Sequence, residues 1–317
     1  MPAPSTLRPE GTVLLIVSLA SHQPVPDATL TTASGQQFQG DAGGRVTLTS
    51  AVEMSSVVTV SAGGFLDRRT VLSNHTTLTL WPRTDVETNL TEDFTSDVIY
   101  RAECGTRAPQ RMIRLSPTVT HVYIAPTPDI MEQTDRPQRW AMPAREAHEL
   151  AVAELNRVLA PGIRFELVST PPTTGFVVPV TVGPTAHTCS AASAFATYTF
   201  TPRGDIIGGE ITHCGLTTPQ NDDFGTANLP FVVLHEMGHI IGLGHSRDAG
   251  DVMNSCPAGG TTGTFRGFDV DTFSARERLV LPMMLQRSAG NAFPDDDGPV
   301  AGGASIAFGS GRTVIVH

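Results

Sequence analysis

Residues 235–245 read His-Glu-Met-Gly-His-Ile-Ile-Gly-Leu-Gly-His and combine three imidazoles with one carboxylate. Three protein ligands of this kind bind zinc and leave a fourth position open for water, as catalytic sites require. On a helix, His235 and His239 are four residues apart and lie on one face, one turn from each other. Glu236 then points to the flank of the metal, where it can act on water. The pattern predicts a catalytic zinc site with Glu236 as general base.

The third histidine can join this site only if the helix ends before it. In a continuous helix, His245 would lie about 15 Å beyond His235 along the axis and could not share a metal. Gly242 stands where the helix can end in a left-handed conformation that a residue with a Cβ resists, and Gly244 loosens the same turn. We therefore expect His235, His239 and His245 to be the zinc ligands. The alternative for any single histidine is an ordinary buried core residue, which the combined spacing disfavours.

This extended motif resembles that of the metzincin clan of zinc peptidases, and Ser246 after the third histidine is similar to the matrixin branch. The resemblance implies a methionine turn that forms an apolar floor beneath the metal, and Met253 stands eight residues after the third ligand. No tyrosine follows Met253, which disfavours the astacin-like and serralysin-like branches. The proline that matrixins have shortly after the turn is matched only by Pro257, which follows Cys256. The subfamily therefore stays open.

The resemblance implies a zinc-dependent metalloendopeptidase that hydrolyses proteins or glycoproteins. Zinc would polarise the scissile carbonyl, and Glu236 would take a proton from water and deliver it to the departing amine. An extended substrate would pair with an edge strand, for which 194–200 and 206–213 are the candidates. The family implies that loop 255–268 forms a wall of the substrate pocket. Two alternatives are a non-catalytic adhesion or binding protein with a degenerate zinc domain, and a metallohydrolase that acts on a non-peptide bond.

Apolar periodicity predicts the elements that would hold this site. Strands are expected at 120–125, 163–167, 176–182, 194–200 and 206–213, and helices at 139–159, from about 228 through the zinc motif, and at 272–286. Ser274 and Glu277 form a capping box at the start of the last helix. The order strand, helix, four strands, helix is the one that a metzincin catalytic domain implies, over roughly residues 115–288.

The N-terminal part of the chain has a different pattern. Residues 11–82 are rich in Thr, Val, Ser and Gly, and short alternating runs are separated by turn signals, which favours an all-β sandwich. The turns resemble those of prealbumin-like or carboxypeptidase-regulatory-like modules, whose role could be binding or spacing. The expected fold class is α+β multidomain: this sandwich, then a metzincin-like domain with a twisted mixed sheet and three helices. The expected segments are a flexible start at 1–10, the module at 11–82, a linker at 83–113, the catalytic domain at 114–288 and a tail at 289–317.

Length and charge narrow the class of protein further. A chain of 317 residues has room for about two domains. Its 21 basic and 31 acidic residues give a net charge of −10, and no basic run is present, so nucleic acid is not an expected partner. No apolar stretch reaches the roughly 18 residues of a membrane span. The apolar segment 12–20 is interpreted as a strand, so we expect a secreted or cell-surface monomer whose export signal is absent from this chain.

The four cysteines, Cys104, Cys189, Cys214 and Cys256, lack metal-type spacing and favour disulfides. Reflecting Cys189 through the predicted hairpin brings it close to Cys214, which leaves Cys104 to pair with Cys256. Disulfides would imply an oxidising compartment and hence export. The alternatives are reduced, buried cysteines in a cytoplasmic protein, and a Cys104 thiol that caps zinc and keeps the enzyme latent.

Two acidic runs could bind calcium, at 221–223 and 295–297, but neither has the alternating spacing of a known calcium loop. We interpret both as solvated loops. The further histidines His187 and His213 are interpreted as surface or loop residues.

Overall fold

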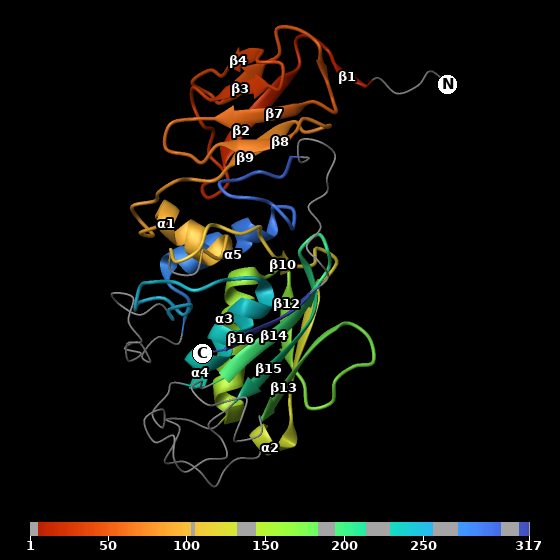
Figure 1. The fold of residues 1–317 in the computed structure, drawn as a ribbon, viewed down its shortest axis with the longest axis vertical. Coiled ribbons are helices and arrows are strands. Elements are labelled where there is room, and N and C mark those ends of the chain that lie inside the picture. The colour runs from red at the N-terminus through yellow and green to blue at the C-terminus, as the bar shows by residue number, and fades with distance from the viewer. Residues whose placement is uncertain are drawn as a thin grey trace. The chain divides into compact units, whose positions relative to one another are not determined.

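The computed structural model describes residues 6–102, 105–131, 144–182, 194–213, 229–255, 272–298 and 311–316. It divides into two compact units, Met1–Asp93 with Asn291–Ile306, and Phe94–Gly290 with Ala307–His317 (Figure 1). The chain is α+β, as predicted. No helix in the described ranges is long and apolar enough to cross a membrane.

The first unit is built from short strands. They are β1 (Leu7–Arg8), β2 (Val13–Ser18), β3 (Thr29–Thr32), β4 (Gln37–Gln39), β5 (Arg45–Thr47), β6 (Val52–Glu53), β7 (Val57–Ser61), β8 (Arg68–Val71) and β9 (Thr77–Leu80). They form the sheets β5-β2-β9 and β4-β3-β7-β8 and the pair β1-β6. Alternation decides which side chains are buried: along β7, for example, Val58 and Val60 are buried between partly exposed neighbours.

One apolar core joins the two larger sheets of this unit. It includes Leu14 and Ile16 from β2, Leu30 from β3, Val60 from β7 and Leu78 from β9, all fully buried. Two sheets that share a core in this way agree with the expected sandwich, which stays a prediction.

The acidic run 295–297 belongs to this first unit. Asp295 is buried and accepts a hydrogen bond of 3.0 Å from the Asn291 side chain. Asp296 pairs with Arg69 at 3.0 Å and Asp297 with Arg68 at 3.2 Å. The prediction of a solvated loop is therefore wrong here, because Asp295 is buried and two arginines of β8 form ion pairs with Asp296 and Asp297. The other run, 221–223, lies outside the described residues.

The second unit contains a mixed sheet. Its strands are β10 (Arg114–Leu115), β11 (His121–Pro126), β12 (Arg164–Leu167), β13 (Phe176–Val182), β14 (Ala194–Phe200), β15 (Asp205–His213) and β16 (Gly311–Val316). The order is β12-β11-β13-β15-β14-β16, and β10 also pairs with β15. Strands β12, β11, β13 and β15 are parallel to one another, whereas β14 runs antiparallel to its neighbours β15 and β16.

The helices of this unit are α1 (Glu92–Phe94, which begins at the division between the units), η1 (Thr95–Ile99), α2 (Pro128–Met131), α3 (Ala144–Leu159), α4 (Leu229–Ile241) and α5 (Ala275–Leu285). Helix α3 packs against α4 and β12, and α4 packs against β14 and β15 (Figure 1). The buried face of α3 includes Ala147, Ala151 and Leu155, whose spacing of four residues produces the apolar stripe. Gly209 of β15 allows the close approach of α4, because a Cβ there would lie 2.5 Å from Ile240.

The predicted strands of the second unit are all present, within one residue at each end. The predicted start of α3 at residue 139 falls on residues outside the described part of the chain. At α5 the capping box is present: the Ser274 hydroxyl accepts from the backbone of Glu277, and the Glu277 carboxylate accepts from the backbone of Ser274. Two strands, β10 and β16, were not expected from the sequence.

Candidate metal centre

Helix α4 carries the first two histidines of the motif. His235 and His239 are 3% and 0% exposed, and Leu234 and Met237 beside them are fully buried. The helix thus lies in the core between the sheet and α3, and its apolar side chains anchor it there. A spacing of four residues places both imidazoles on the same side of the helix, with their ring centroids 4.8 Å apart.

The helix ends at Ile241, where Gly242 adopts a φ of 126°. A side chain at this position would be strained by the φ value and would also collide with the chain before β10, because a Cβ would lie 2.1 Å from the Ile113 carbonyl oxygen. Two residues on, the Gly244 amide donates to the Val98 carbonyl at 2.7 Å. Gly242 therefore redirects the chain and Gly244 holds it close to η1, so that His245 returns toward the helix.

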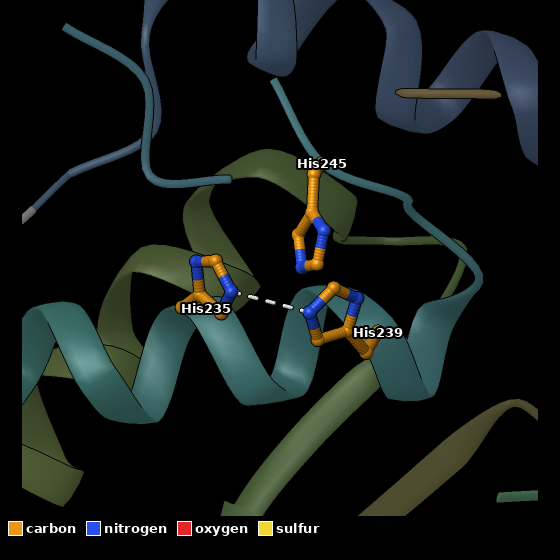
Figure 2. Close-up of side chains that lie close together, drawn as sticks. All are labelled: His235, His239 and His245. Atoms are coloured by element: carbon orange, nitrogen blue, oxygen red, sulfur yellow. Dashed lines mark hydrogen bonds between the residues drawn. The ribbon is translucent and has the colours of Figure 1, made fainter. Parts of the chain in front are cut away.

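Figure 2 shows the result, in which three imidazoles converge on one point. One nitrogen from each ring lies within 4.8 Å of the others. The ring of His245 lies 5.6 Å from that of His235 and 4.9 Å from that of His239, measured between centroids. The structure thus brings together all three histidines that the sequence singled out.

Hydrogen bonds determine which nitrogens face this point. Nδ1 of His235 lies 2.6 Å from the Val252 carbonyl oxygen, and Nδ1 of His239 lies 2.8 Å from that of Leu243. A carbonyl only accepts, so each Nδ1 carries the proton and each neutral ring presents a lone pair on Nε2. The two Nε2 atoms are 3.2 Å apart (Figure 2). Two lone pairs at that distance repel unless a proton or a cation lies between them.

Burial keeps the rings of His235 and His245 neutral. Desolvation lowers the pKa of His235 to about 4, although its bond to Val252 opposes the shift. Desolvation, together with the charges of His235 and Arg101, lowers the pKa of His245 to about 3. Because a metal binds the neutral imidazole, both rings are ready to ligate a metal at neutral pH.

Glu236 follows His235 on α4 and is buried, with 1% of its surface exposed. Burial raises the pKa of its carboxyl group well above the usual value, and a backbone hydrogen bond from Ala196 of β14 lowers it in part. Its Oε2 atom has no hydrogen-bond partner among the described residues. A buried carboxylate oxygen in this state can accept a hydrogen bond from a water or ligand, or contact a cation.

Met253 lies beneath the helix and is fully buried. A Cβ on Gly238, which stands between the two helix histidines, would lie 2.3 Å from the Met253 sulfur. Only glycine at this position lets the methionine reach the helix backbone beneath the two rings. The sequence pattern pointed to the methionine, but it gave no reason for the glycine.

Glu277 of α5 holds the turn that carries Met253. Besides capping its own helix, its buried carboxylate accepts from the backbone amides of Val252 at 3.1 Å and Met253 at 2.8 Å. Burial, followed by the nearby charge of Asp251, raises its pKa to about 7. The capping box was visible in the sequence, whereas this second role was not, because the turn lies more than twenty residues earlier.

Replacement of Glu277 by alanine is expected to destabilise the fold by about 2–4 kcal/mol, because two buried amides lose their acceptor at a cost of about 1–3 kcal/mol each. Chemical denaturation followed by circular dichroism measures this change. Ser274→Ala is the matched control, since it removes only the cap and should cost about 1 kcal/mol. Equal effects of the two substitutions would show that Glu277 acts on the helix alone.

A second buried network braces the same turn. Arg276 donates two hydrogen bonds to Asp251, at 3.0 and 2.6 Å, and the Ser246 hydroxyl donates to the same carboxylate. The Ser246 amide donates to the Met253 carbonyl at 2.7 Å. The residue after the third histidine is therefore tied directly to the methionine turn, so the ligand loop and the floor of the site form one unit.

The remaining histidine and cysteine predictions have different outcomes. His213 is 3% exposed and packs edge to face against His148 of α3, so its interpretation as a surface residue is wrong. Burial lowers the pKa of His148 to about 4, and burial together with His148 lowers that of His213 to about 3. His187, most of the predicted pocket loop 255–268 and the four cysteines lie outside the described residues, so the disulfide pairing stays a prediction.

The donor set suits zinc: three imidazoles converge, and the next residue after His235, Glu236, has a buried carboxylate oxygen without a hydrogen-bond partner in the described part of the chain. A mixed sheet with an antiparallel strand β14, a helix that carries two of the converging histidines and a methionine packed against that helix agree with a metzincin-like zinc peptidase domain. Residues 127–271 match the family model described as Matrixin, and this match supports a matrixin domain in that part of the chain. No curated protein matches the chain.

Proposed function

We propose that the chain is a secreted zinc-dependent endopeptidase in which His235, His239 and His245 hold the metal and Glu236 is the general base. The observation that carries the proposal is the convergence of three imidazoles on α4 and the loop after it, with the buried Glu236 next to His235 on the same helix. The matrixin match supports a metallopeptidase and protein substrates.

Zinc, when bound, supplies a Lewis acid for the scissile carbonyl and the attacking water. Glu236 Oε2 accepts one proton from that water as the water oxygen bonds to the carbonyl carbon. The same proton then passes to the amide nitrogen, so that the C–N bond breaks and a neutral amine leaves. The Ala196 amide donates a hydrogen bond to the Glu236 carboxylate and so helps to hold this side chain in position.

The charge of a bound metal would affect the ability of Glu236 to act as a base. Burial raises the pKa of the Glu236 carboxyl group and so opposes the charged form, which is the form that accepts a proton. A divalent cation held by the three rings lowers the carboxyl pKa and restores the charged form. A bound metal would therefore favour the form of Glu236 that can act as a base.

The test is metal analysis combined with cleavage-site profiling of the purified chain. We expect one zinc per chain after dialysis, cleavage of a proteome-derived peptide library, loss of cleavage with a chelator, and recovery when zinc is added back. Stoichiometric zinc without cleavage of any peptide or protein would favour the alternative, an adhesion or binding protein that uses its N-terminal unit.

A further inference from the structure

The outer edge of β14 is the place where an extended peptide would meet the proposed base. Of the two strands that the sequence offered for this role, β15 is interior, because it pairs with both β13 and β14. Strand β14 lies beside the metal centre, since its Ala196 amide donates to Glu236. Addition of a peptide to an exposed strand edge is a common form of recognition, in which backbone hydrogen bonds supply the affinity.

This edge is occupied by the chain itself. Strand β16 runs antiparallel to β14, with six residue pairs from Phe195 opposite Val316 to Phe200 opposite Gly311. Ile315 is paired with Ala196, the residue that contacts Glu236. A strand edge presents one row of amide and carbonyl groups, so β16 and a substrate cannot pair with it at the same time.

We propose that residues 311–316 act as an internal pseudosubstrate, which binds the peptide-binding edge of β14 and keeps the peptidase latent until the segment is displaced or removed. This inference rests on the proposed function. The segment is suited to the role, because Thr313, Val314, Ile315 and Val316 are all β-branched and favour an extended strand.

The sheet can lose β16 without losing β14. Strand β14 keeps seven residue pairs with β15 on its other side and also packs against α4. In contrast, β14 is the one described element with which β16 makes an extensive contact. A strand held along one edge only is the part of a sheet that opens most readily.

A segment that binds β14 only weakly can still inhibit when it is part of the same chain. A flexibly linked segment has an effective concentration of about 1 mM, so a free Kd of about 100 μM would already give about tenfold more closed than open molecules. Removal of the segment should therefore raise kcat/KM about tenfold for a peptide that pairs with β14.

The first test compares the full chain with a chain that ends at Ser310, using a quenched fluorescent peptide and equal zinc loading. A second variant, Val314→Pro with Ile315→Pro, keeps the length of the chain. Alternate residues of a strand bond to a given neighbour, so one of two adjacent prolines must remove a bonded amide. The matched control, Val314→Thr with Ile315→Thr, keeps the amides and the β-branched shape. We expect about a tenfold rise for the truncation and the proline variant, and a much smaller change for the threonine control.

The second test does not need hydrolysis. A fluorescent Gly311–Val316 peptide is titrated onto the zinc-loaded truncated chain that carries Glu236→Gln, and we expect saturable binding that is lost when prolines replace Val314 and Ile315 in the peptide. Failure of the peptide to bind would overturn the inference, as would unchanged activity in the truncated chain. Loss of cooperative unfolding in both the truncated and proline variants would also overturn it, because β16 would then be a structural strand. Peptide binding with no hydrolysis by any zinc-loaded form would instead refute the proposed function and leave the occupied edge in place.

Discussion

Glu236→Gln should retain one zinc per chain and lose about 10²–10⁴-fold in kcat/KM, the usual contribution of a general base. Glutamine has nearly the same shape as glutamate and can still accept from the Ala196 amide, but it cannot take a proton from water. The side chain is buried, so solvent has little access to replace it. The measurement is steady-state hydrolysis of a fluorescent peptide, with zinc content determined on the same sample.

Glu149→Gln is the matched control for this substitution, because Glu149 is an exposed glutamate on α3. We expect its activity to equal that of the unmodified chain. Full activity of the Glu236 variant with zinc in place would show that another group accepts the proton.

His245→Ala should remove stoichiometric zinc and abolish hydrolysis. Without His245, only the two histidines of α4 remain to bind the metal. Removal of a residue that hydrogen-bonds to a metal ligand typically lowers metal affinity about 10–100-fold, and we expect removal of a ligand itself to lower it more. His245 is also less buried than the helix histidines, so the fold should tolerate alanine better at this position. Metal analysis after dialysis, with competition by a zinc chelator, measures the effect.

His75→Ala serves as the control for this variant, since it removes an exposed histidine of the first unit. It should keep one zinc per chain. If His245→Ala also kept one zinc per chain after dialysis, His245 would not be a ligand, and the return of the chain at Gly242 would have only a structural role.

The strands and the main helices of the second unit could be predicted because their signals are local. The bounds of β13 and β14 agree with the alternation of the sequence, and turn residues separate β14 from β15. The helix α4 follows from an apolar run that continues into the histidine motif, with glycine at its end. Each of these signals lies within one element or one turn.

The supports of the site depend on contacts between distant residues, and sequence patterns carry little information on such contacts. Glu277 reaches back to Met253, and Gly238 makes room for the same methionine. The acidic run at 295–297 was interpreted as solvated because its arginine partners precede it by more than 200 residues. In the same way, the burial of His213 depends on its contact with α3.

Three imidazoles and one carboxylate lie within eleven residues, so the sequence by itself determined the side chains of the candidate centre and the need for a helix that ends before Gly242. Only the tertiary structure decided which edge of the sheet lies beside Glu236 and which segment occupies it. Pairing of β16 with β14 joins residues more than a hundred positions apart. Such pairing depends on backbone groups that every residue carries, and therefore no local pattern of side chains predicts it.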